Sequence, residues 1–537
     1  MADGPPQTNP SSGEFAPVVP PRDAPMVYGV TSAPPPAQPA AGPVGGPQAA
    51  PAQETVVVPT STPPPGGAVP TDVIQNPFIP QGVTPNEAQA APASAGGAVH
   101  GSGVRRIIMM LVLLLFVLGI ALAGKFALGF LTQQQEVTIT YWGLWEDDAT
   151  VRSVLTAFEG AHPKIKVSYF KQSPKQYRER LADAIARGEG PDVFRFHNTW
   201  VPMLRGDLAT VPVKIMTAAQ FASAFYPVAS RDLVAGTNIY GIPLEIDGLG
   251  LYYNEDTLAQ AGVSVPTTYE ELLNVVPKLT VKNGNTIVSS AIALGTTNNV
   301  EHFSDIVATM MMQNGAKLDQ PTGAEAEQTL IFYRKFADFA DPAYTWNETM
   351  DNSISAFASG NVAMILAPSW RAFDIKQINP ALRFKIAAVP QLPGNTVTWA
   401  SYWVEGVSSK SKNQNAAWEF VNYLTSREAA IKLYTEESKI RLFGEPYARV
   451  ELGASIKDDP YAGAFITQAS LDARSFPLSS RTFDNGLNDK LIKYLEDAIN
   501  GMAGGVAPSA VLQTMASGFR QVLGQYGLTS GVAPASR

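Results

Sequence analysis

The sequence contains no cysteine among its 537 residues. This absence excludes disulfide bonds, catalytic thiolates, cysteine metal sites and a lipid-modified cysteine as a membrane tether. Histidine is also scarce, because the chain has only four, and no two of them stand at the helical spacing of a metal-binding pair. Only His197 falls near a predicted binding region. We therefore expect neither a bound metal nor a cofactor.

Long runs of positive charge are missing as well. The formal net charge is −8, and no lysine-rich or arginine-rich segment interrupts the sequence. Nucleic acid is therefore not an expected partner, since its binding requires a basic patch.

Residues 1–104 have few large apolar side chains and a single lysine or arginine, Arg22, yet they hold more than half of the 43 prolines. Such a segment buries too little apolar surface to offset its conformational entropy. We expect this Pro/Ala/Gly-rich tail to be disordered, and expect the same of residues 528–537.

One long hydrophobic run follows the tail. Ile107 to Gly124 carries no charge over eighteen residues, which is enough to cross a hydrocarbon core. We predict a transmembrane helix over 105–131. Because Arg105 and Arg106 precede the run, the positive-inside rule places the tail in the cytoplasm and the remaining chain outside.

Two alternatives remain for this run. Ala121-Leu122-Ala123 resembles a signal-peptidase site, so the segment could be a cleaved signal, although its leader would be far longer than usual. The stretch from Gly119 to Lys125 matches most of a phosphate-binding loop. Phe126 stands where that pattern needs Ser or Thr, so we treat the match as chance.

Beyond Gln135 the pattern alternates between strands and helices. Apolar residues at helical spacing predict two helices, one with Val151, Val154, Leu155 and Phe158 on a face and one with Tyr177, Leu181 and Ile185. Strands are predicted over 137–142, 165–170 and 192–196. A β-α-β-α-β order requires a parallel sheet covered on both faces.

Ligands of such sheets bind beyond the carboxyl ends of the strands. Here those ends are Trp142 to Asp147 and Phe196 to Trp200, both rich in tryptophan and in amide or carboxylate groups. Aromatic faces and polar side chains together suit a carbohydrate. Each aromatic taken singly could equally fill a core.

Five segments in order resemble the extracellular solute-binding proteins of the sugar-binding family, the maltose-binding-protein type that serves ATP-driven importers. They are TITYWGLWED, YRERLADAIARGEGPDVF, IYGIPLEIDGLGLYYNEDTLAQAGV with PTTYEELL, AFASGNVAMILAPSW and SSKSKNQNAAWEFVNYLTSREAA. The resemblance implies an α/β, two-lobed periplasmic-binding-protein fold with doubly wound sheets and a hinge. It implies a solute-binding domain over 136–527, with lobe one over about 136–244 and 404–455 and lobe two over about 248–398 and 456–527.

The resemblance also implies where ligand contacts fall. The expected ligand-binding residues are Trp145, Glu146, Asn198, Trp200, Asp247, Trp370, Arg371, Tyr402 and Trp403. Trp370 follows the predicted strand Val362–Leu366, where the family often stacks a tryptophan on a sugar ring; packing in the core is the alternative. Glu146 could equally be a solvated residue at a helix start.

Two crossings between the lobes carry further expectations. We place the hinge near Leu244 to Gly248, with Asp247 facing the cleft and Glu245 turned away or bracing the hinge. In the second crossing, Trp399 and Trp403 would share one face of a strand and Tyr402 the other, so at least one of the three should reach the cleft.

The expected function is that of a single-pass protein of the bacterial cell membrane. Its extracytoplasmic domain would bind a sugar or oligosaccharide by hinge closure and present it to the permease subunits of an ABC importer. A ligand-sensing receptor that signals across the membrane is the alternative. An enzyme is not expected, because the sequence contains no nucleophile elbow and no metal-binding motif.

Overall fold

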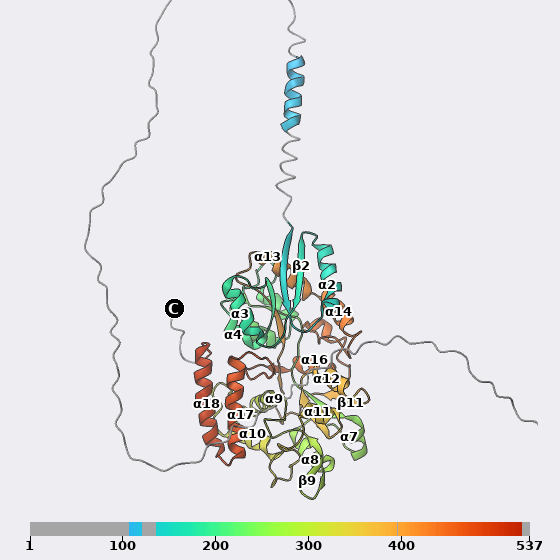
Figure 1. The fold of residues 1–537 in the computed structure, drawn as a ribbon, viewed down its shortest axis with the longest axis vertical. Coiled ribbons are helices and arrows are strands. Elements are labelled where there is room, and N and C mark those ends of the chain that lie inside the picture. Colours follow the sequence, from blue (N-terminus) through green and yellow to red (C-terminus); the bar gives the residue numbers. More distant parts are fainter. Residues whose placement is uncertain (1–106, 121–135, 395, 529–537) are drawn as a thin grey trace, which may run out of the picture. The chain divides into compact units, whose positions relative to one another are not determined.

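The computed structural model describes residues 107–120, 136–394 and 396–528. The predicted tail, the flanks of the predicted membrane segment and residues 529–537 lie outside this described part. Residues 107–120 form a helix whose large apolar side chains are exposed (Figure 1). Within the described ranges, no helix combines the length and the apolar character needed to cross a membrane.

The first sheet has the strand order β2-β1-β3-β13-β6. Its strands are β1 (Val137–Gly143), β2 (Ile165–Lys171), β3 (Val193–His197), β6 (Ile242–Pro243) and β13 (Trp403–Val407). Strand β1 pairs in parallel with both β2 and β3, which confirms the predicted β-α-β-α-β unit. Strand β13 is antiparallel to β3 and arrives from far along the chain.

Helices cover this sheet and form lobe one with it (Figure 1). They are α2 (Asp148–Ala161), α3 (Tyr177–Arg187), η1 (Asn198–Trp200), α4 (Val201–Leu204), α5 (Ala218–Ala224), α6 (Pro227–Leu233), α13 (Gln414–Leu424) and α14 (Arg427–Glu437), with the short hairpin β4 (Val234–Ala235) and β5 (Asn238–Ile239). The side chains predicted on the apolar faces of α2 and α3 are all buried in its core.

The second sheet, of lobe two, has the order β11-β7-β10-β9-β8. Its strands are β7 (Gly250–Asn254), β8 (Val281–Asn283), β9 (Thr286–Ile292), β10 (Val362–Ala367) and β11 (Phe384–Ala387). Only β9 and β10 pair in parallel, so this sheet is mixed. Mixed sheets are common in α/β proteins, where a return strand adds to a parallel pair.

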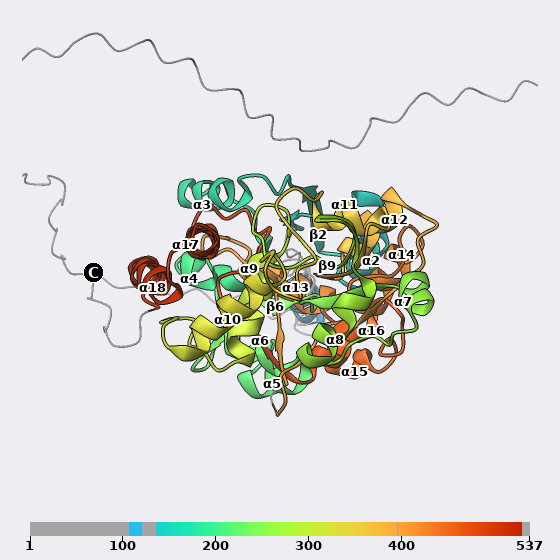
Figure 2. The same cartoon turned by 90° about the horizontal axis from the view of Figure 1, so that it is seen from below.

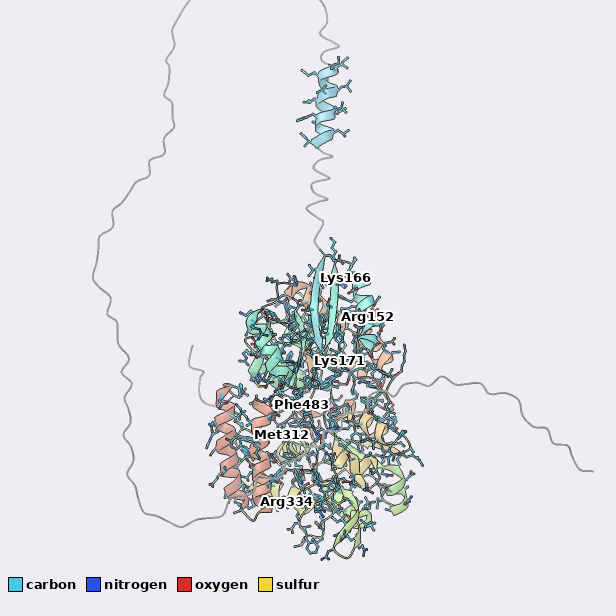
Figure 3. The ribbon with its side chains drawn as sticks, in the orientation of Figure 1. Arg152, Lys166, Lys171, Met312, Arg334 and Phe483 are labelled. Carbon is cyan, nitrogen blue, oxygen red and sulfur yellow. The ribbon has the colours of Figure 1, made fainter. Side chains whose placement is uncertain are left out.

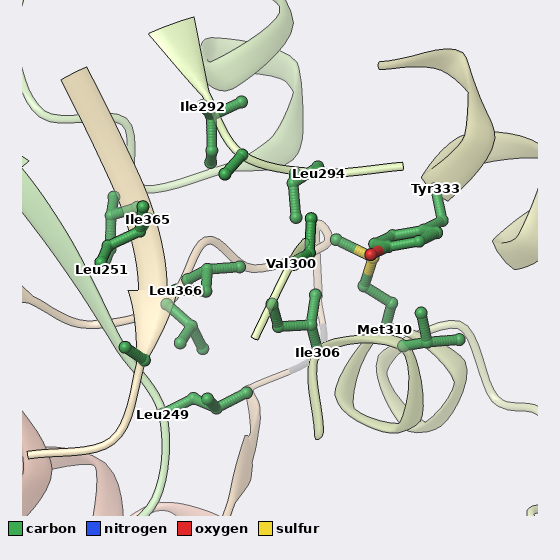
Figure 4. Close-up of a cluster of buried hydrophobic side chains, with 14 of the residues drawn as sticks. Leu249, Leu251, Ile292, Leu294, Val300, Ile306, Met310, Tyr333, Ile365 and Leu366 are labelled. Carbon is green, nitrogen blue, oxygen red and sulfur yellow. The ribbon is translucent and has the colours of Figure 1, made fainter. Parts of the chain in front are cut away.

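The helices of lobe two pack against this sheet and around one core. They are α7 (Glu255–Ala261), α8 (Tyr269–Leu279), α9 (Phe303–Gln313), α10 (Ala324–Lys335), α11 (Ser353–Ala358), α12 (Arg371–Ile378), α17 (Leu487–Ala503) and α18 (Pro508–Gln525). Figure 4 shows Leu251 and Ile365 of the sheet together with Ile306 and Met310 of α9 in this core. Helices α17 and α18 lie side by side at its edge (Figures 1 and 2).

The start of α8 is held by reciprocal hydrogen bonds between side chains and backbone. Thr268 is the N-cap, and its hydroxyl accepts from the Glu271 backbone N–H at 3.1 Å. The Glu271 carboxylate in turn accepts from the backbone N–H of Thr267 at 2.7 Å. This satisfies N–H groups that a helix start leaves without internal partners.

The chain changes core at the two predicted crossings. In the first, Ile246 packs in the core of lobe one and Leu249 in that of lobe two. In the second, Trp399 packs in lobe two and Tyr402 in lobe one. The crossings lie side by side, because Gly248 forms an antiparallel bridge with Ala400.

One inference about the second crossing was wrong. Trp399 ends β12 (Val397–Trp399), which pairs with β14 (Asp472–Arg474), whereas Trp403 begins β13 of the first sheet. They belong to different strands, so the argument that they share a strand face does not apply. A third crossing segment, around Tyr447, pairs with Glu245. After Tyr447 the chain forms α15 (Val450–Gly453) and α16 (Gly463–Ala469), and α16 contributes to both cores.

The contact between the two crossings yields a stability prediction. A Cβ added at Gly248 would lie 2.1 Å from the Trp399 carbonyl oxygen, a backbone atom that cannot rotate away. We expect Gly248→Ala to lower the free energy of unfolding by ~1–3 kcal/mol, the usual result of overpacking. Urea denaturation followed by circular dichroism would measure it.

Gly160→Ala is the matched control, because Gly160 lies within α2 and a Cβ there meets nothing within 4 Å. That variant should gain ~0.5–1 kcal/mol, as alanine does over glycine inside a helix. Equal stability of the two variants would contradict the close approach of the crossings.

Candidate functional site

The predicted convergence of strand ends in lobe one is confirmed. Trp145 follows β1, His197 ends β3, Trp200 lies in η1 and Trp403 begins β13. Strand β13 is antiparallel to β3, and Trp403 is the register partner of His197, so the start of one meets the end of the other. These four residues form what we call the lobe-one aromatic cluster.

The rings of the lobe-one aromatic cluster pack edge to face. Trp403 is its centre, with ring centroids 5.3 Å from Trp145, 5.1 Å from His197 and 5.4 Å from Trp200. Edge-to-face pairs place a positive ring edge against a negative ring face and so fix each ring's orientation. Trp145 and Trp403 are half-buried, whereas Trp200 is only 1 % exposed. Trp145 and Trp403 therefore have ring surface for a ligand, and Trp200 supports them.

His197, the fourth ring of the lobe-one aromatic cluster, is held in its neutral form. Its Nδ1 lies 2.8 Å from the Thr199 hydroxyl and its Nε2 lies 3.0 Å from the Ser401 hydroxyl. Burial lowers the pKa of His197 to about 3. An uncharged imidazole therefore supports the aromatic cluster at physiological pH.

Asn198 and Tyr402 meet in a separate polar network. The Asn198 amide donates to Asp232 at 2.8 Å, and its Oδ1 accepts from the Tyr402 backbone N–H at 3.2 Å. The Tyr402 hydroxyl also donates to Asp232 at 2.8 Å. Asn198 is 2 % and Tyr402 0 % exposed. In this conformation both are engaged within the protein, and a direct ligand contact by either stays a prediction.

Glu146 is buried in an ion-pair network. Arg195 Nη1 contacts both of its carboxylate oxygens, at 2.7 and 2.8 Å, and Arg195 Nε contacts Glu405 at 2.7 Å. All three side chains are at most 3 % exposed. The alternative of a solvated helix-start residue is thereby wrong for Glu146. Arg195 stands in the middle of the apolar strand β3, and Glu405 in the middle of the apolar strand β13. A charged residue in such a position is the sequence feature that points to this buried ion pair.

In lobe two, the half-buried tryptophan comparable to Trp145 and Trp403 is Trp370. It stands between β10 and α12, half-buried, with the His302 ring edge-on at 5.7 Å and the Arg371 guanidinium 4.0 Å from its ring centroid. A guanidinium over an indole face is a favourable cation–π contact. Trp370 and Arg371 were predicted from the sequence as ligand contacts, whereas His302 was not among the predicted residues.

The Arg371 guanidinium is largely occupied by protein partners. It contacts Glu301 at 2.8 Å, Asp374 at 2.7 Å and His302 Nε2 at 3.0 Å. Arg371 therefore holds Trp370 in place, and its own contact with a ligand stays a prediction.

Asp247 ties the first crossing to the turn that carries Trp370. Its Oδ1 accepts from the backbone N–H groups of Gly248 at 2.8 Å and Ser369 at 3.1 Å. The Tyr252 hydroxyl fixes the same turn by donating to the Pro368 carbonyl at 2.5 Å. Burial raises the pKa of the Asp247 carboxyl to about 8, against the opposing effect of these N–H donors. Asp247 is 8 % exposed, so its visible role is to position Trp370.

Glu245 points into lobe one and braces the crossing. Its carboxylate accepts from the Trp403 backbone N–H at 3.2 Å and lies against Glu445 of the third crossing segment. Burial, reinforced by the Glu445 charge, raises the pKa of Glu245 well above its usual range. The first crossing thus contacts a half-buried tryptophan site in each lobe.

Residues 475–486 form a loop between β14 and α17 that contacts both lobes. No role was predicted for this loop from the sequence. Arg178 of lobe one donates to the Asp484 carbonyl at 2.6 Å, and the Ser480 N–H donates to Asp305 of lobe two at 3.0 Å. Phe483 of this loop lies at the level where the lobes meet (Figure 3).

Comparisons with known proteins agree with this architecture. The family profile of bacterial extracellular solute-binding proteins matches residues 153–461, more than half of the chain. The chain belongs to this family. Among solved structures, it is similar to a cyclo/maltodextrin-binding protein complexed with maltotetraose, with a TM-score of 0.60 and 19 % identity over 73 % of this chain and 98 % of the other. That likeness shows the two-lobed fold.

Two curated relatives have a higher percent identity over a smaller part of this chain. A multiple sugar-binding protein of Streptococcus mutans is 24 % identical over 316 residues, 56 % of this chain and 74 % of the relative. A maltooligosaccharide ABC transporter solute-binding lipoprotein of Streptococcus pneumoniae is 23 % identical over 332 residues, 58 % of this chain and 73 % of the relative. These relatives are binding proteins rather than enzymes.

Asp305 gives a pH prediction for this solute-binding protein. It lies in α9 beneath the second crossing and accepts from Trp399 Nε1 at 3.0 Å and from the Ser480 N–H. Burial raises its pKa to about 6. Between about pH 4 and pH 6 the folded state keeps a proton that the unfolded chain has lost, so this group's contribution to stability falls as the pH rises.

We therefore expect the free energy of unfolding of Asp305→Asn, minus that of the wild type, to increase by up to ~3 kcal/mol from pH 4 to pH 7. Urea titrations at each pH would measure it. A difference that stays constant across this range would show that Asp305 ionises normally in the folded protein.

Proposed function

We propose that this chain is the substrate-binding subunit of an ABC importer and that it binds a sugar or oligosaccharide between its lobes. The observation that carries the proposal is the pair of half-buried tryptophan sites: Trp145 with Trp403 in lobe one, and Trp370 in lobe two. Sugar rings present C–H faces that stack on indole, while their hydroxyls bond to polar groups at the rim. The first crossing contacts both sites, so bending there changes their separation.

The names of the relatives support the same substrate class. One is named for multiple sugars and one for maltooligosaccharides, and a structural neighbour holds maltotetraose. Of the nine residues expected from the sequence, Trp145, Trp370 and Trp403 are proposed to contact the ligand directly, and the other six are proposed to border the site and support these three. The proposed lobes keep the boundaries given by the resemblance, 136–244 with 404–455 and 248–398 with 456–527.

The direct test is a binding titration with a panel of mono- and oligosaccharides that includes maltose, maltotriose and maltotetraose. We expect saturable quenching of tryptophan fluorescence by at least one sugar, with no product formed. Absence of both quenching and thermal stabilisation across the panel would refute the sugar assignment.

Trp370→Ala separates a binding role from a packing role. We expect Kd for the sugar identified above to rise at least about tenfold, or ~1.4 kcal/mol, because a stacking face is lost. The melting temperature should change little, since Trp370 is half-buried. Isothermal calorimetry and thermal denaturation would measure the two effects.

Trp418→Phe provides the opposite control, because Trp418 of α13 is 1 % exposed and lies in the core of lobe one. It should lower the melting temperature and leave Kd unchanged. If Trp370→Ala instead lost stability without losing affinity, Trp370 would be a packing residue.

We further propose that the segment over 105–131 anchors the binding domain outside the bacterial cell membrane in a single pass. The apolar side chains of residues 107–120 are exposed on their helix, which is the arrangement that a lipid environment accommodates. Protease added outside intact cells should remove the binding domain and spare an epitope in the tail. Loss of the tail epitope would refute this orientation.

A further inference from the structure

The loop between β14 and α17 forms hydrogen bonds with both lobes, although its buried leucine packs in lobe two. That residue, Leu478, is 1 % exposed and lies in the core of lobe two, as does Leu487 at the start of α17. We call residues 475–486 the bridging loop. Its hydrogen bonds with lobe one are therefore bonds across the boundary between the lobes.

In lobe two, the bridging loop contacts the neighbours of Trp370. The Ser480 hydroxyl lies 2.6 Å from Nδ1 of His302, whose ring packs edge-on against Trp370. Arg481 forms an ion pair with Glu301, which is also a partner of the guanidinium that lies over the Trp370 ring. The middle of the loop is thus bonded to two residues that help to fix this indole.

In lobe one, the end of the bridging loop and the first turn of α17 reach the lobe-one aromatic cluster. Arg178 of α3 donates to the Asp484 carbonyl at 2.6 Å. The Asn488 amide donates to the Thr199 hydroxyl at 2.8 Å, and that hydroxyl lies 2.8 Å from Nδ1 of His197. The same segment is therefore connected to the tryptophan site of each lobe.

The beginning of the bridging loop contacts lobe one as well. The Ser475 hydroxyl donates to Asp232 at 2.5 Å. Asp232 is the carboxylate that Asn198 and Tyr402 share. Both ends of the loop are therefore bonded to lobe one, and its middle is bonded to lobe two.

The backbone of the bridging loop adopts a conformation that its residues disfavour. Arg481, Phe483 and Asn485 have positive φ angles of 61°, 52° and 45°. Within the described ranges, Gln176 is the only other residue besides glycine with a positive φ. A side chain at positive φ is strained, because its Cβ approaches the carbonyl oxygen that follows. Backbone strain is therefore concentrated in this one loop.

Two buried hydroxyl groups of the bridging loop add to this cost. Ser479 Oγ and Thr482 Oγ1 have no hydrogen-bond partner in the part of the chain that the structure describes, and their side chains are 0 % and 2 % exposed. Buried polar atoms are normally paired, and an unpaired one is destabilising. The conformation of the loop is therefore maintained by its bonds to the lobes rather than by its own preferences.

We propose that the bridging loop is a latch, which holds the lobes in the arrangement that the structure shows and slows the release of a bound sugar. Strained segments persist where surrounding contacts hold them, and here those contacts come from both lobes. When the lobes separate, the bonds to Arg178 and Thr199 break and the loop relaxes to unstrained φ angles. The strain opposes the bonds, so the latch is reversible. Only the identity of the ligand rests on the function proposed above.

The first measurement follows the distance between the lobes without any ligand. Because the chain has no cysteine, Val213→Cys and Phe339→Cys place one spin label at an exposed position of each lobe. Double electron–electron resonance on the full-length protein in detergent should then give a single narrow distance distribution. Arg178→Met in this background should broaden and shift the distribution, because it removes a bond between the lobes.

Arg180→Met is the matched control. Arg180 also lies in α3, but its guanidinium donates to the carbonyls of Ser173 and Lys175 in the same lobe. Its distance distribution should equal that of the labelled parent. If Arg178→Met gave the same distribution as Arg180→Met, the latch would be refuted.

Phe483→Ala and Phe483→Gly separate backbone strain from loss of the ring. Both remove a side chain that is 40 % exposed, but only glycine adopts a φ of 52° without strain. The glycine variant should therefore show a narrower distance distribution than the alanine variant. Identical distributions would refute the latch, and this pair decides the question alone if Arg178→Met does not fold.

The second measurement is the dissociation rate of maltotetraose, or of the panel sugar that binds most tightly, by stopped-flow tryptophan fluorescence. Arg178→Met should raise the dissociation rate constant about fivefold, the factor expected from one lost hydrogen bond, and Arg180→Met should leave it unchanged. An unchanged rate constant in Arg178→Met would contradict the latch. If no sugar of the panel binds, the proposed function fails, while the distance distributions still decide whether the latch exists.

Discussion

The buried guanidinium of Arg195 is the interaction on which the arrangement of lobe one depends. It lies in the middle of β3, 2 % exposed, and joins Glu146 after β1 to Glu405 in β13. Removing one member of such a network would leave a buried charge without a partner, which typically destabilises a protein by ~3–5 kcal/mol. The network therefore fixes the position of β13, a strand supplied from far along the chain. The same contact sets the direction of the loop that carries Trp145.

The tryptophan sites depend on this arrangement and on its counterpart in lobe two. In lobe one, the pairing of β13 with β3 brings Trp403 against His197. In lobe two, Asp247 and Tyr252 hold the turn before Trp370. In both places a buried polar group determines where a half-buried indole stands. Preorganisation of this kind reduces the entropy that ligand binding must overcome.

The crossings link these two sites physically. Gly248 lies against Ala400, and Glu245 against Tyr447, so three separate chain segments form the connection between the lobes. Little space separates the first two, since a Cβ added at Gly248 would lie 2.1 Å from the Trp399 carbonyl oxygen.

Local patterns in the sequence determined the β-α-β-α-β unit, the N-cap of α8, the first crossing and the position of Trp370, because each depends on residues close together in the chain. The tertiary structure alone decided the rest. The pairing of β13 with β3, the separation of Trp399 from Trp403 into two sheets, and the meeting of Glu146 with Glu437 and Glu445 are contacts between distant segments. Local periodicity carries no information about such contacts, since they are selected by the burial of whole strands and helices.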